Sequence, residues 1–352
     1  MTAKRDWKDT VLDGVRAGRP VGGPAQVHID VTNTCNAKCV TCWDHSPLLN
    51  TPRTMAWKQQ KLPWERFEET LAALDRLGSV RAVVLSGMGE PLLHPRIYDM
   101  MAAVKARGWH LTVLSNLLAA DLDRLCVSGV DNLLVGVHGA TPDAYTAFHP
   151  GWTDKSFQQL CAALRRLVAA GIQTRHVQVI DRHTAPDVVR MVSFGRRFGA
   201  ERVNYKLASL AHGTEAAAIT PEQHRWLVDE AVPRARAEAE RQGVHTNLHL
   251  FEQQLANPDA LTTTNMDAIG CFMGFAYSRV AVDGTVLFCC NTEIEVGHLA
   301  DAPLDELWAG ERWQQLRERI ARKEWFPGCA RCGKYEQNVK WSQRMAETRA
   351  AT

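Results

Sequence analysis

The sequence predicts an α/β protein built on a mostly parallel sheet, either a partial barrel or an open sheet. Short apolar runs alternate with longer amphipathic stretches over residues 27–207, and strands that alternate with helices are typical of βα units. Six such units are visible, which is too few for a closed eight-unit barrel. In either arrangement, functional loops should follow the carboxyl ends of the strands.

The strands of these units are expected at the apolar runs. They are Val27–Val31, Val80–Leu85, Leu111–Ser115, Asn132–Val137, Val177–Ile180 and Arg202–Leu207. The stretches between them carry apolar residues at helical spacing, as Phe67, Leu71 and Leu74 do. The helices are therefore predicted at Trp64–Leu77, Arg96–Arg107, Ala120–Val127, Ser156–Ala170 and Ala185–Phe198.

Beyond Leu207 the pattern changes to a long helix, a linker and a hairpin. Thr220-Pro221 begins the helix, which is expected to continue to Arg241. Asp283-Gly284 between two β-prone runs is a hairpin signal. The elements predicted here are the helix Thr220–Arg241, the linker Asn257–Asp267, the strands Tyr277–Val282 and Thr285–Cys289, the helices Leu304–Trp308 and Trp313–Ile320, and a final helix after Lys334.

Composition indicates a soluble globular chain. Hydrophobic residues make up 45% and charged residues 23% of the 352 residues, which are ordinary values. The net charge of +2 argues against a nucleic-acid partner. No apolar run reaches the roughly 18 residues that span a bilayer, and Met1 to Arg19 lack an apolar signal core. A cytoplasmic protein is expected, and ten cysteines in a reducing compartment indicate metal or redox chemistry.

Three cysteines follow the first predicted strand. Cys35, Cys39 and Cys42 are separated by three and two residues, so that they can wrap one metal cluster. Cluster sites usually supply four cysteines, and three leave one iron open to another ligand. An open position is what a catalytic metal site needs. A zinc site with a distant fourth ligand, such as a histidine, remains the alternative.

The ends of the second, third and fourth strands carry further candidates. Glycines at a strand end permit close backbone approach, although a simple turn is the alternative. Asn at a strand end is often only a turn residue, and a lone His can be a structural group. The candidate residues are Gly87, Met88, Gly89, Glu90, Ser115, Asn116, Gly136 and His138.

A second set of cysteines lies near the C-terminus. It consists of Cys271, Cys289, Cys329 and Cys332, and four thiolates complete a tetrahedral zinc or a cubane iron–sulfur site without a vacancy. Cys290 is left over. It is expected to lie buried beside the site, although it can also replace Cys289 as a ligand or donate a hydrogen atom.

The first cysteine motif, on the first βα loop, resembles the signature of the radical S-adenosylmethionine (radical SAM) superfamily. Ser86–Pro95 resembles its Gly-Gly-Glu motif. The resemblance implies a partial (β/α)6 TIM-like barrel and a [4Fe–4S] cluster whose open iron binds S-adenosylmethionine. It also implies reductive cleavage to a 5′-deoxyadenosyl radical and cofactor contacts from the strand-end residues named above. The chain departs from the family at Thr41, usually aromatic, at Gly136, often Ser, and at His138, often Asp.

The C-terminal motif resembles the Twitch domain, the short form of the SPASM extension. The residues that carry this resemblance are Val282–Cys290, Gly297–Leu299 and Leu304–Trp308. It implies a small α+β domain with one auxiliary [4Fe–4S] cluster on Cys271, Cys289, Cys329 and Cys332, because residues 333–352 contain no further cysteine. The implied division is an extension (1–26), the barrel (27–215), a helical linker (216–265) and the Twitch domain with its tail (266–352).

A fully ligated auxiliary cluster has no site for substrate, so electron transfer is its expected task. The resemblance therefore implies dehydrogenation or epimerisation in natural-product biosynthesis, with decarboxylation also within the family. A small polar substrate such as a sugar, cyclitol or nucleoside derivative is expected, because only 34 residues precede Cys35, whereas peptide-modifying relatives often carry a leader-binding module there. The alternatives are a maturase that crosslinks or epimerises a ribosomally made peptide and, more remotely, a non-catalytic iron–sulfur or zinc protein. Flavodoxin or ferredoxin is the expected reductant.

Substrate contacts are expected from the sixth strand and the loops above the barrel. Tyr205 and Lys206 alternate along the strand, so only one of them faces inward. Lys206 can bind an anionic group, although a solvated lysine is the alternative. The remaining candidates are His45, Asp181, His183 and Glu215.

Overall fold

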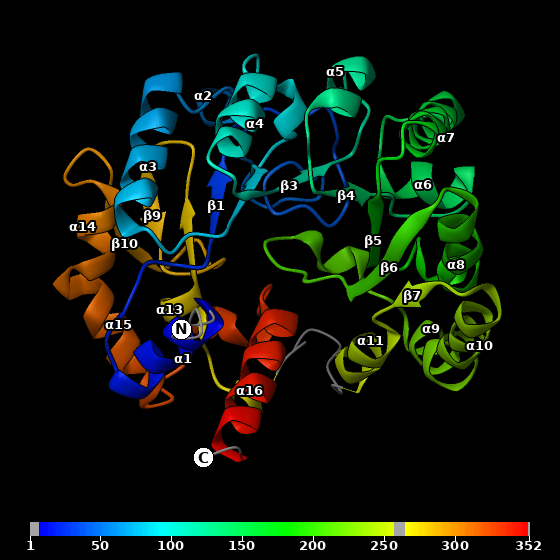
Figure 1. Ribbon diagram of the computed structural model, residues 1–352. Coiled ribbons are helices and arrows are strands. Elements are labelled where there is room, and N and C mark those ends of the chain that lie inside the picture. The colour runs from blue at the N-terminus through cyan, green and yellow to red at the C-terminus, as the bar shows by residue number, and fades with distance from the viewer. Residues whose placement is uncertain (1–6, 257–264, 351–352) are drawn as a thin grey trace.

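The computed structural model describes residues 7–256 and 265–350. Its centre is one sheet in the order β10-β9-β8-β1-β2-β3-β4-β5-β6-β7, with helices packed along its outer face (Figure 1). The strands are β1 (Gln26–Asp30), β2 (Ala82–Ser86), β3 (His110–Ser115), β4 (Asn132–Gly136), β5 (Thr174–Ile180), β6 (Ala200–Leu207), β7 (His245–Thr246), β8 (Tyr277–Val280), β9 (Thr285–Leu287) and β10 (Glu295–His298).

The helices of the first six units alternate with these strands. They are α1 (Trp7–Ala17), α2 (Met55–Lys58), α3 (Trp64–Leu77), α4 (Ile97–Ala106), α5 (Leu122–Val127), α6 (Pro142–Phe148), α7 (Asp154–Ala169) and α8 (Val188–Arg197). The later helices are α9 (Pro221–Trp226), α10 (Val232–Gln242), α11 (Leu248–Leu255), α12 (Met266–Ile269), α13 (Met273–Ala276), α14 (Leu304–Ala309), α15 (Glu311–Ala321) and α16 (Tyr335–Ala350).

The predicted α/β architecture is confirmed. Strands β1 to β6 are parallel and paired in sequence order, as expected of a partial barrel. The final helix after Lys334 is present as α16. The sequence did not predict the helices α1, α2, α6, α11, α12 and α13 or the strands β7 and β10. Of the predicted linker Asn257–Asp267, residues 257–264 lie outside the described residues.

The predicted helix Thr220–Arg241 is interrupted. A π-helical turn over Leu227–Ala231 separates α9 from α10. Pro233 lies two residues beyond this turn, and proline has no N–H to donate to the carbonyl four residues earlier. The regular series of α-helical backbone hydrogen bonds therefore cannot continue through this point, and the helix forms a π turn here.

The C-terminal hairpin extends the barrel sheet. Strand β8 pairs in parallel with β1, with Tyr277 opposite Gln26, while β9 returns antiparallel to β8. The turn between them contains Gly284 at φ 99°, a conformation that favours glycine. This pairing brings the C-terminal cysteines close to the strand that precedes the N-terminal cysteines.

Alternation along β1 separates an apolar face from a polar one. Val27, Ile29 and Val31 are fully buried in the same cluster as Phe67 and Leu71 of α3. Successive strand residues point to opposite faces. His28 and Asp30 therefore lie on the inner, concave face of the sheet.

Helix α16 bridges the open side of the barrel (Figure 1). Its first turns form an ion pair of 3.3 Å with Arg202 of β6 through Glu336. Gln337 donates a hydrogen bond of 3.3 Å to Gln26 of β1, and Tyr335 bonds Gln253 of α11. The helix thereby connects β1 and β6, which are not neighbours in the sheet.

Among the described residues, no helix is both long enough and apolar enough to cross a membrane.

A buried histidine should make stability depend on pH. His176 of β5 is fully buried and contacts Phe194, and neither ring nitrogen has a hydrogen-bond partner in the described part of the chain. Burial lowers its pKa to about 3, whereas the unfolded value is about 6.5. The neutral form is favoured in the fold, so this contribution is present above pH 6.5 and is lost as the pH falls toward 3.

His176→Leu should remove about 2 kcal/mol of the stability difference between pH 7 and pH 5. Urea unfolding of wild type and variant at both pH values measures this difference. His249→Leu, at an exposed position on α11, is the control and should keep the wild-type dependence. An unchanged pH dependence in His176→Leu would show that this histidine is not held neutral.

Candidate active site

The loop after β1 is clamped from two sides. On one side, the Asn33 N–H donates to the Gln60 carbonyl (3.0 Å), and the Thr34 hydroxyl donates to the Lys58 carbonyl (3.0 Å). On the other, the Val40 N–H donates to the carbonyl of Phe148 at the end of α6 (3.0 Å). These contacts fix the backbone before and within the first cysteine motif.

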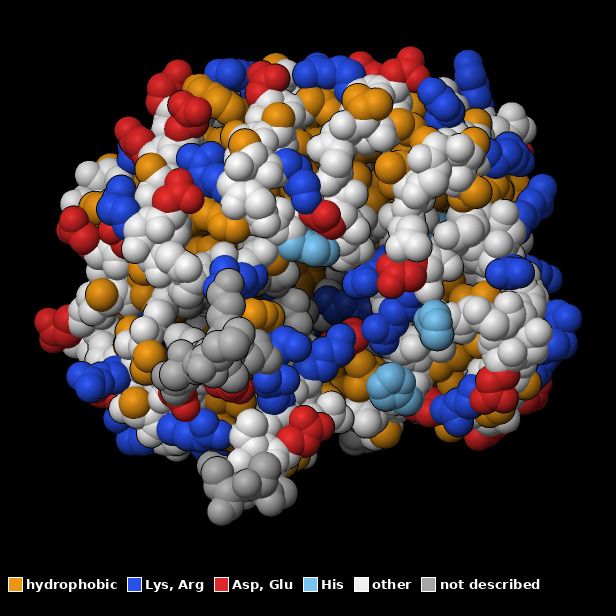
Figure 2. All heavy atoms as spheres, viewed as in Figure 1, with side chains coloured by type: hydrophobic (Ala, Val, Ile, Leu, Met, Phe, Trp, Pro, Cys, Tyr) orange, Lys and Arg blue, Asp and Glu red, His pale blue; other side chains and the backbone are white. Residues whose placement is uncertain are grey.

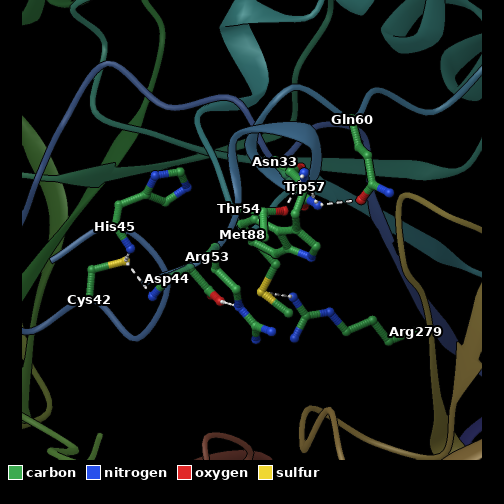
Figure 3. A network of polar contacts seen from close by, with 10 residues as sticks. All are labelled: Asn33, Cys42, Asp44, His45, Arg53, Thr54, Trp57, Gln60, Met88 and Arg279. Atoms are coloured by element: carbon green, nitrogen blue, oxygen red, sulfur yellow. Dashed lines mark hydrogen bonds and ion pairs between the residues drawn. The ribbon is translucent and has the colours of Figure 1, made fainter. Parts of the chain in front are cut away.

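The three N-terminal thiols lie together. Burial is the largest cause that raises the pKa of Cys39, and the neighbouring Cys42 and Cys35 thiols raise it further. Backbone N–H groups point at the sulfur atoms, from Ala37 to Cys35 (3.4 Å) and from His45 to Cys42 (3.3 Å); Figure 3 shows the latter bond. Such donors favour the thiolate, the form that binds metal.

The donor set fits an iron–sulfur cluster. It consists of soft thiols, which suit iron–sulfur clusters and zinc better than hard cations. In residues 7–256 and 265–350, no group of three or more His, Cys, Asp or Glu side chains is arranged to hold a single metal ion. A four-iron cluster is larger than one ion and holds its ligands further apart.

Gly87 and Gly89 let the β2 loop lie directly against the cysteine loop. A Cβ on Gly87 would be 2.2 Å from the Thr32 carbonyl oxygen, and a Cβ on Gly89 would be 2.2 Å from that of Thr34. The Gly89 and Glu90 N–H groups donate to these same carbonyls at 3.1 and 2.8 Å. Only glycine permits this contact, which forms a backbone cradle beside Cys35.

Glu90 joins the ends of β2 and β3. Its Oε1 accepts hydrogen bonds from Leu92 N–H (3.1 Å) and the Ser115 hydroxyl (2.7 Å), and its Oε2 accepts one from Asn116 N–H (2.8 Å). The Asn116 side chain donates to Asn36 of the cysteine loop (2.8 Å). These side chains position the three loops against one another, and their direct contact with the cofactor stays a prediction.

Glu90→Gln should destabilise this junction. All three partners are donors, so the glutamine NH2 would face a donor and leave a buried group unsatisfied, at a cost of about 1–3 kcal/mol. Urea unfolding should show this loss, and S-adenosylmethionine should bind more weakly. The exposed Glu65→Gln on α3 is the control and should change stability by less than about 0.5 kcal/mol. Wild-type stability in Glu90→Gln would show that the Glu90 carboxylate does not stabilise the junction between these loops.

At the end of β4, the ring of His138 lies over Gly136. A Cβ on Gly136 would be 2.8 Å from His138 Nε2. His138 Nδ1 accepts a hydrogen bond from Val179 N–H (3.1 Å), and burial lowers its pKa to about 3. The ring is therefore neutral and carries its proton on Nε2, which makes it a hydrogen-bond donor at the end of β4.

The C-terminal cysteines also converge, and all five do so. Burial is the first cause that raises the pKa of Cys271, followed, after a backbone hydrogen bond that lowers it, by the Cys329 and Cys290 thiols. The Cys290 thiol bonds both Cys289 and Cys332, so it lies within the group. The Cys289 sulfur accepts a hydrogen bond from Asn291 N–H (3.4 Å). The fold thus offers one more thiol than a cubane cluster needs.

An ion pair that sequence reasoning missed lies between the two cysteine sites. Arg279 of β8 donates to Asp30 of β1 at 2.8 Å, to the Met88 sulfur at 3.4 Å and to the Cys290 carbonyl at 3.4 Å. Figure 3 shows Arg279 extending toward Met88. The polar residues that alternate with Val27, Ile29 and Val31 were the available signal for this inner face.

Of the predicted pair on β6, Lys206 faces inward. Tyr205 packs outward against Phe251, and its hydroxyl donates to the Val188 carbonyl (3.1 Å). Tyr205 is therefore part of the core between β6 and its helices. A side chain in this position does not face the concave side of the sheet, where a substrate contact was expected. Strand alternation then places Lys206 on the concave face.

The other loop candidates mostly stabilise turns. Asp181 Oδ1 accepts from the N–H groups of His183 and Thr184 (both 2.9 Å), and Glu215 accepts from Gly213 N–H (2.8 Å). His45 lies against Trp57. Sequence reasoning missed Arg53, which pairs with the buried Asp44 at 2.8 Å.

Figure 2 shows a hollow at the centre of one face, with Lys and Arg side chains around it. The thiol groups, the glycine cradle and this basic hollow define the class of protein, an iron–sulfur enzyme. The model of the radical SAM superfamily matches residues 29–194, and the model of the SPASM iron–sulfur cluster-binding domain matches residues 271–333. The chain therefore carries a radical SAM domain and a SPASM domain.

Curated relatives span most of the chain. A PqqA peptide cyclase of Ruegeria pomeroyi is 28% identical over 302 residues, covering 82% of this chain and 74% of that protein. A tungsten-containing aldehyde ferredoxin oxidoreductase cofactor-modifying protein of Pyrococcus furiosus is 21% identical, covering 87% and 86%. Both similarities extend across the barrel and the C-terminal part.

Solved structures share the fold. SuiB of Streptococcus suis bound to S-adenosylmethionine has a TM-score of 0.62 at 15% identity, covering 84% of this chain and 68% of that one. The enzyme anSMEcpe with bound AdoMet has a TM-score of 0.63 at 13% identity, covering 93% and 94%. The family implies a [4Fe–4S] cluster, an auxiliary cluster and S-adenosylmethionine, which confirms the expected cofactors.

Proposed function

We propose that this enzyme is a maturase that modifies a peptide by forming a crosslink or ring. The similarity to PqqA peptide cyclases carries the proposal, at 28% identity for the Ruegeria pomeroyi protein and 23% over 323 residues for a Xanthomonas campestris protein. The small polar substrate expected from the sequence has less support from these relatives than its alternative, a ribosomally made peptide.

In this proposal each cysteine set holds its own cluster. Cys35, Cys39 and Cys42 hold the first, beside the Gly87–Glu90 cradle for S-adenosylmethionine. With these groups bound, the site supplies reductive cleavage of the sulfonium and a carbon radical that abstracts hydrogen. Cys271, Cys329 and Cys332 hold the auxiliary cluster with Cys289 or Cys290 as the fourth ligand.

In this proposal, residues on the concave face of the sheet orient the peptide. Asp30 Oδ1 is buried and has no hydrogen-bond partner among the described residues, so it can accept from a substrate N–H. The His138 Nε2–H can donate to a carboxylate or carbonyl. Lys206 and Cys290 remain candidates for contact with the reacting residue.

The overall reaction removes two hydrogens from the peptide. One C–H bond breaks homolytically, and the hydrogen atom leaves in 5′-deoxyadenosine. The new bond then forms, one proton passes to solvent, and one electron passes to the auxiliary site. S-adenosylmethionine is the co-reactant and is cleaved to methionine and 5′-deoxyadenosine. Flavodoxin or ferredoxin stays the predicted source of the priming electron.

Mass spectrometry tests this function. The anaerobically loaded enzyme is incubated with dithionite, S-adenosylmethionine and short peptides encoded beside its gene. A peptide product about 2 Da lighter, with matching 5′-deoxyadenosine, supports the proposal. Cys126→Ser, on α5 outside both cysteine sets, is the active control. Unchanged peptides together with consumption of a small polar metabolite would favour the original expectation instead.

A further inference from the structure

Two lysines face the auxiliary cysteines without a carboxylate partner. Neither the Lys206 nor the Lys334 ammonium forms a hydrogen bond or ion pair within residues 7–256 and 265–350. Lys334 comes two residues after Cys332, and its Nζ lies 4.1 Å from the centre of the Tyr277 ring. Tyr277 is in turn hydrogen-bonded to His28 on the concave face (3.0 Å). This contact holds Lys334 inside the barrel.

The charge that both lysines face is that of the cysteines. Gly333, between Cys332 and Lys334, lies against the Cys290 sulfur, because a Cβ at this position would be 3.3 Å from that atom. The Lys334 and Lys206 charges both act on the Cys290 thiol. One of the two lysines lies on β6 and the other lies in the segment before α16.

The nearby carboxylates do not neutralise these lysines. Asp30 is paired with Arg279 at 2.8 Å, and Asp44 is paired with Arg53 at 2.8 Å. Arg279 itself approaches the Cys290 carbonyl (3.4 Å), with its charge offset by Asp30. Among the described residues, no carboxylate pairs with either lysine, so the two lysines contribute positive charge beside the auxiliary thiols.

We infer that Lys206 and Lys334 raise the reduction potential of the auxiliary cluster and so make it an acceptor for the substrate's electron. A cluster bound by four thiolates is anionic and gains a further negative charge when it is reduced, and adjacent cations favour the more negative state. Net charge and surroundings set the potentials of such clusters. This inference rests on the proposed auxiliary site and names the residues that tune it.

The experiment isolates the auxiliary cluster in the full chain. A parent with Cys35, Cys39 and Cys42 all replaced by alanine is loaded anaerobically, and its midpoint potential is measured by EPR-monitored redox titration. Lys334→Gln and Lys206→Gln should each shift the potential to more negative values, and the double variant should shift it further. Lys334→Arg should keep the parent value, as should Lys155→Gln, an exposed position on α7.

Each outcome decides the inference. Unchanged potentials in both glutamine variants would overturn it and assign the lysines to an anionic group on the substrate. An equal shift in Lys155→Gln would also overturn it, because the effect would then come from net charge alone. A parent that binds no cluster would overturn the proposed auxiliary site as well, a result that iron analysis distinguishes. Circular dichroism checks that each variant is folded. Because the two lysines lie on separate elements, the inference can still be tested with one variant if the other does not fold.

Discussion

Cys39→Ser should abolish 5′-deoxyadenosine formation and halve the iron content. Cys39 is the central ligand of its loop, with its thiol among those of Cys35 and Cys42. Changes to the outer shell of a metal site already cost about 10–100-fold, so loss of a ligand should cost at least about a hundredfold. Anaerobic samples with dithionite and S-adenosylmethionine, assayed by chromatography, measure the rate.

Iron analysis accompanies this assay. Wild type should hold about eight irons per chain and Cys39→Ser about four, because the auxiliary site is unaffected. Cys126→Ser, at a half-buried position on α5, should keep both the iron and the activity. Retention of about eight irons and full activity in Cys39→Ser would exclude this loop as the catalytic cluster site.

Gly89→Ala should weaken S-adenosylmethionine binding strongly and leave both clusters in place. The added Cβ would lie 2.2 Å from the Thr34 oxygen and 2.6 Å from the carbonyl carbons of Asn33 and Thr34, all backbone atoms that cannot move aside without shifting the cysteine loop. Overpacking of this kind typically destabilises a fold by about 1–3 kcal/mol. The displaced cradle should lower the affinity for S-adenosylmethionine by at least about tenfold.

Equilibrium binding of S-adenosylmethionine, with iron analysis alongside, separates this effect from cluster loss. Gly310→Ala is the matched control, because its φ is −70° and its nearest contact would be at 3.2 Å. It should bind the cofactor as wild type does. Wild-type affinity in Gly89→Ala would show that the β2 loop does not form the cradle.

Local patterns predicted much of the fold and the metal chemistry. The six strands and the amphipathic helices follow from the alternation of apolar residues, and Asp283-Gly284 marked the hairpin. Cysteine spacing is also local, since Cys35, Cys39 and Cys42 lie on one loop. Because backbone propensity and side-chain periodicity act over a few residues, such features can be read from the chain directly.

The π turn before Pro233 and the helix α6 show where local reading fails. The apolar and Ala-rich pattern runs through Leu227–Ala231 without interruption, and only the missing N–H of Pro233 reveals the break. Helix α6 follows Thr141, whose side chain caps it, and Pro142 at its first turn. These start signals were present, but the helix has only seven residues and too little periodicity to stand out.

The sequence by itself determined the two cysteine sets, the order of βα units and the superfamily that they resemble. Only the tertiary structure decided that Lys206 rather than Tyr205 faces inward, that Cys290 lies among the auxiliary thiols, and that Asp30 meets Arg279 across 249 residues of chain. The physical reason is strand register, because a shift by one residue exchanges the inner and outer faces. Register between β1 and β8 arises from long-range pairing, which local sequence does not encode.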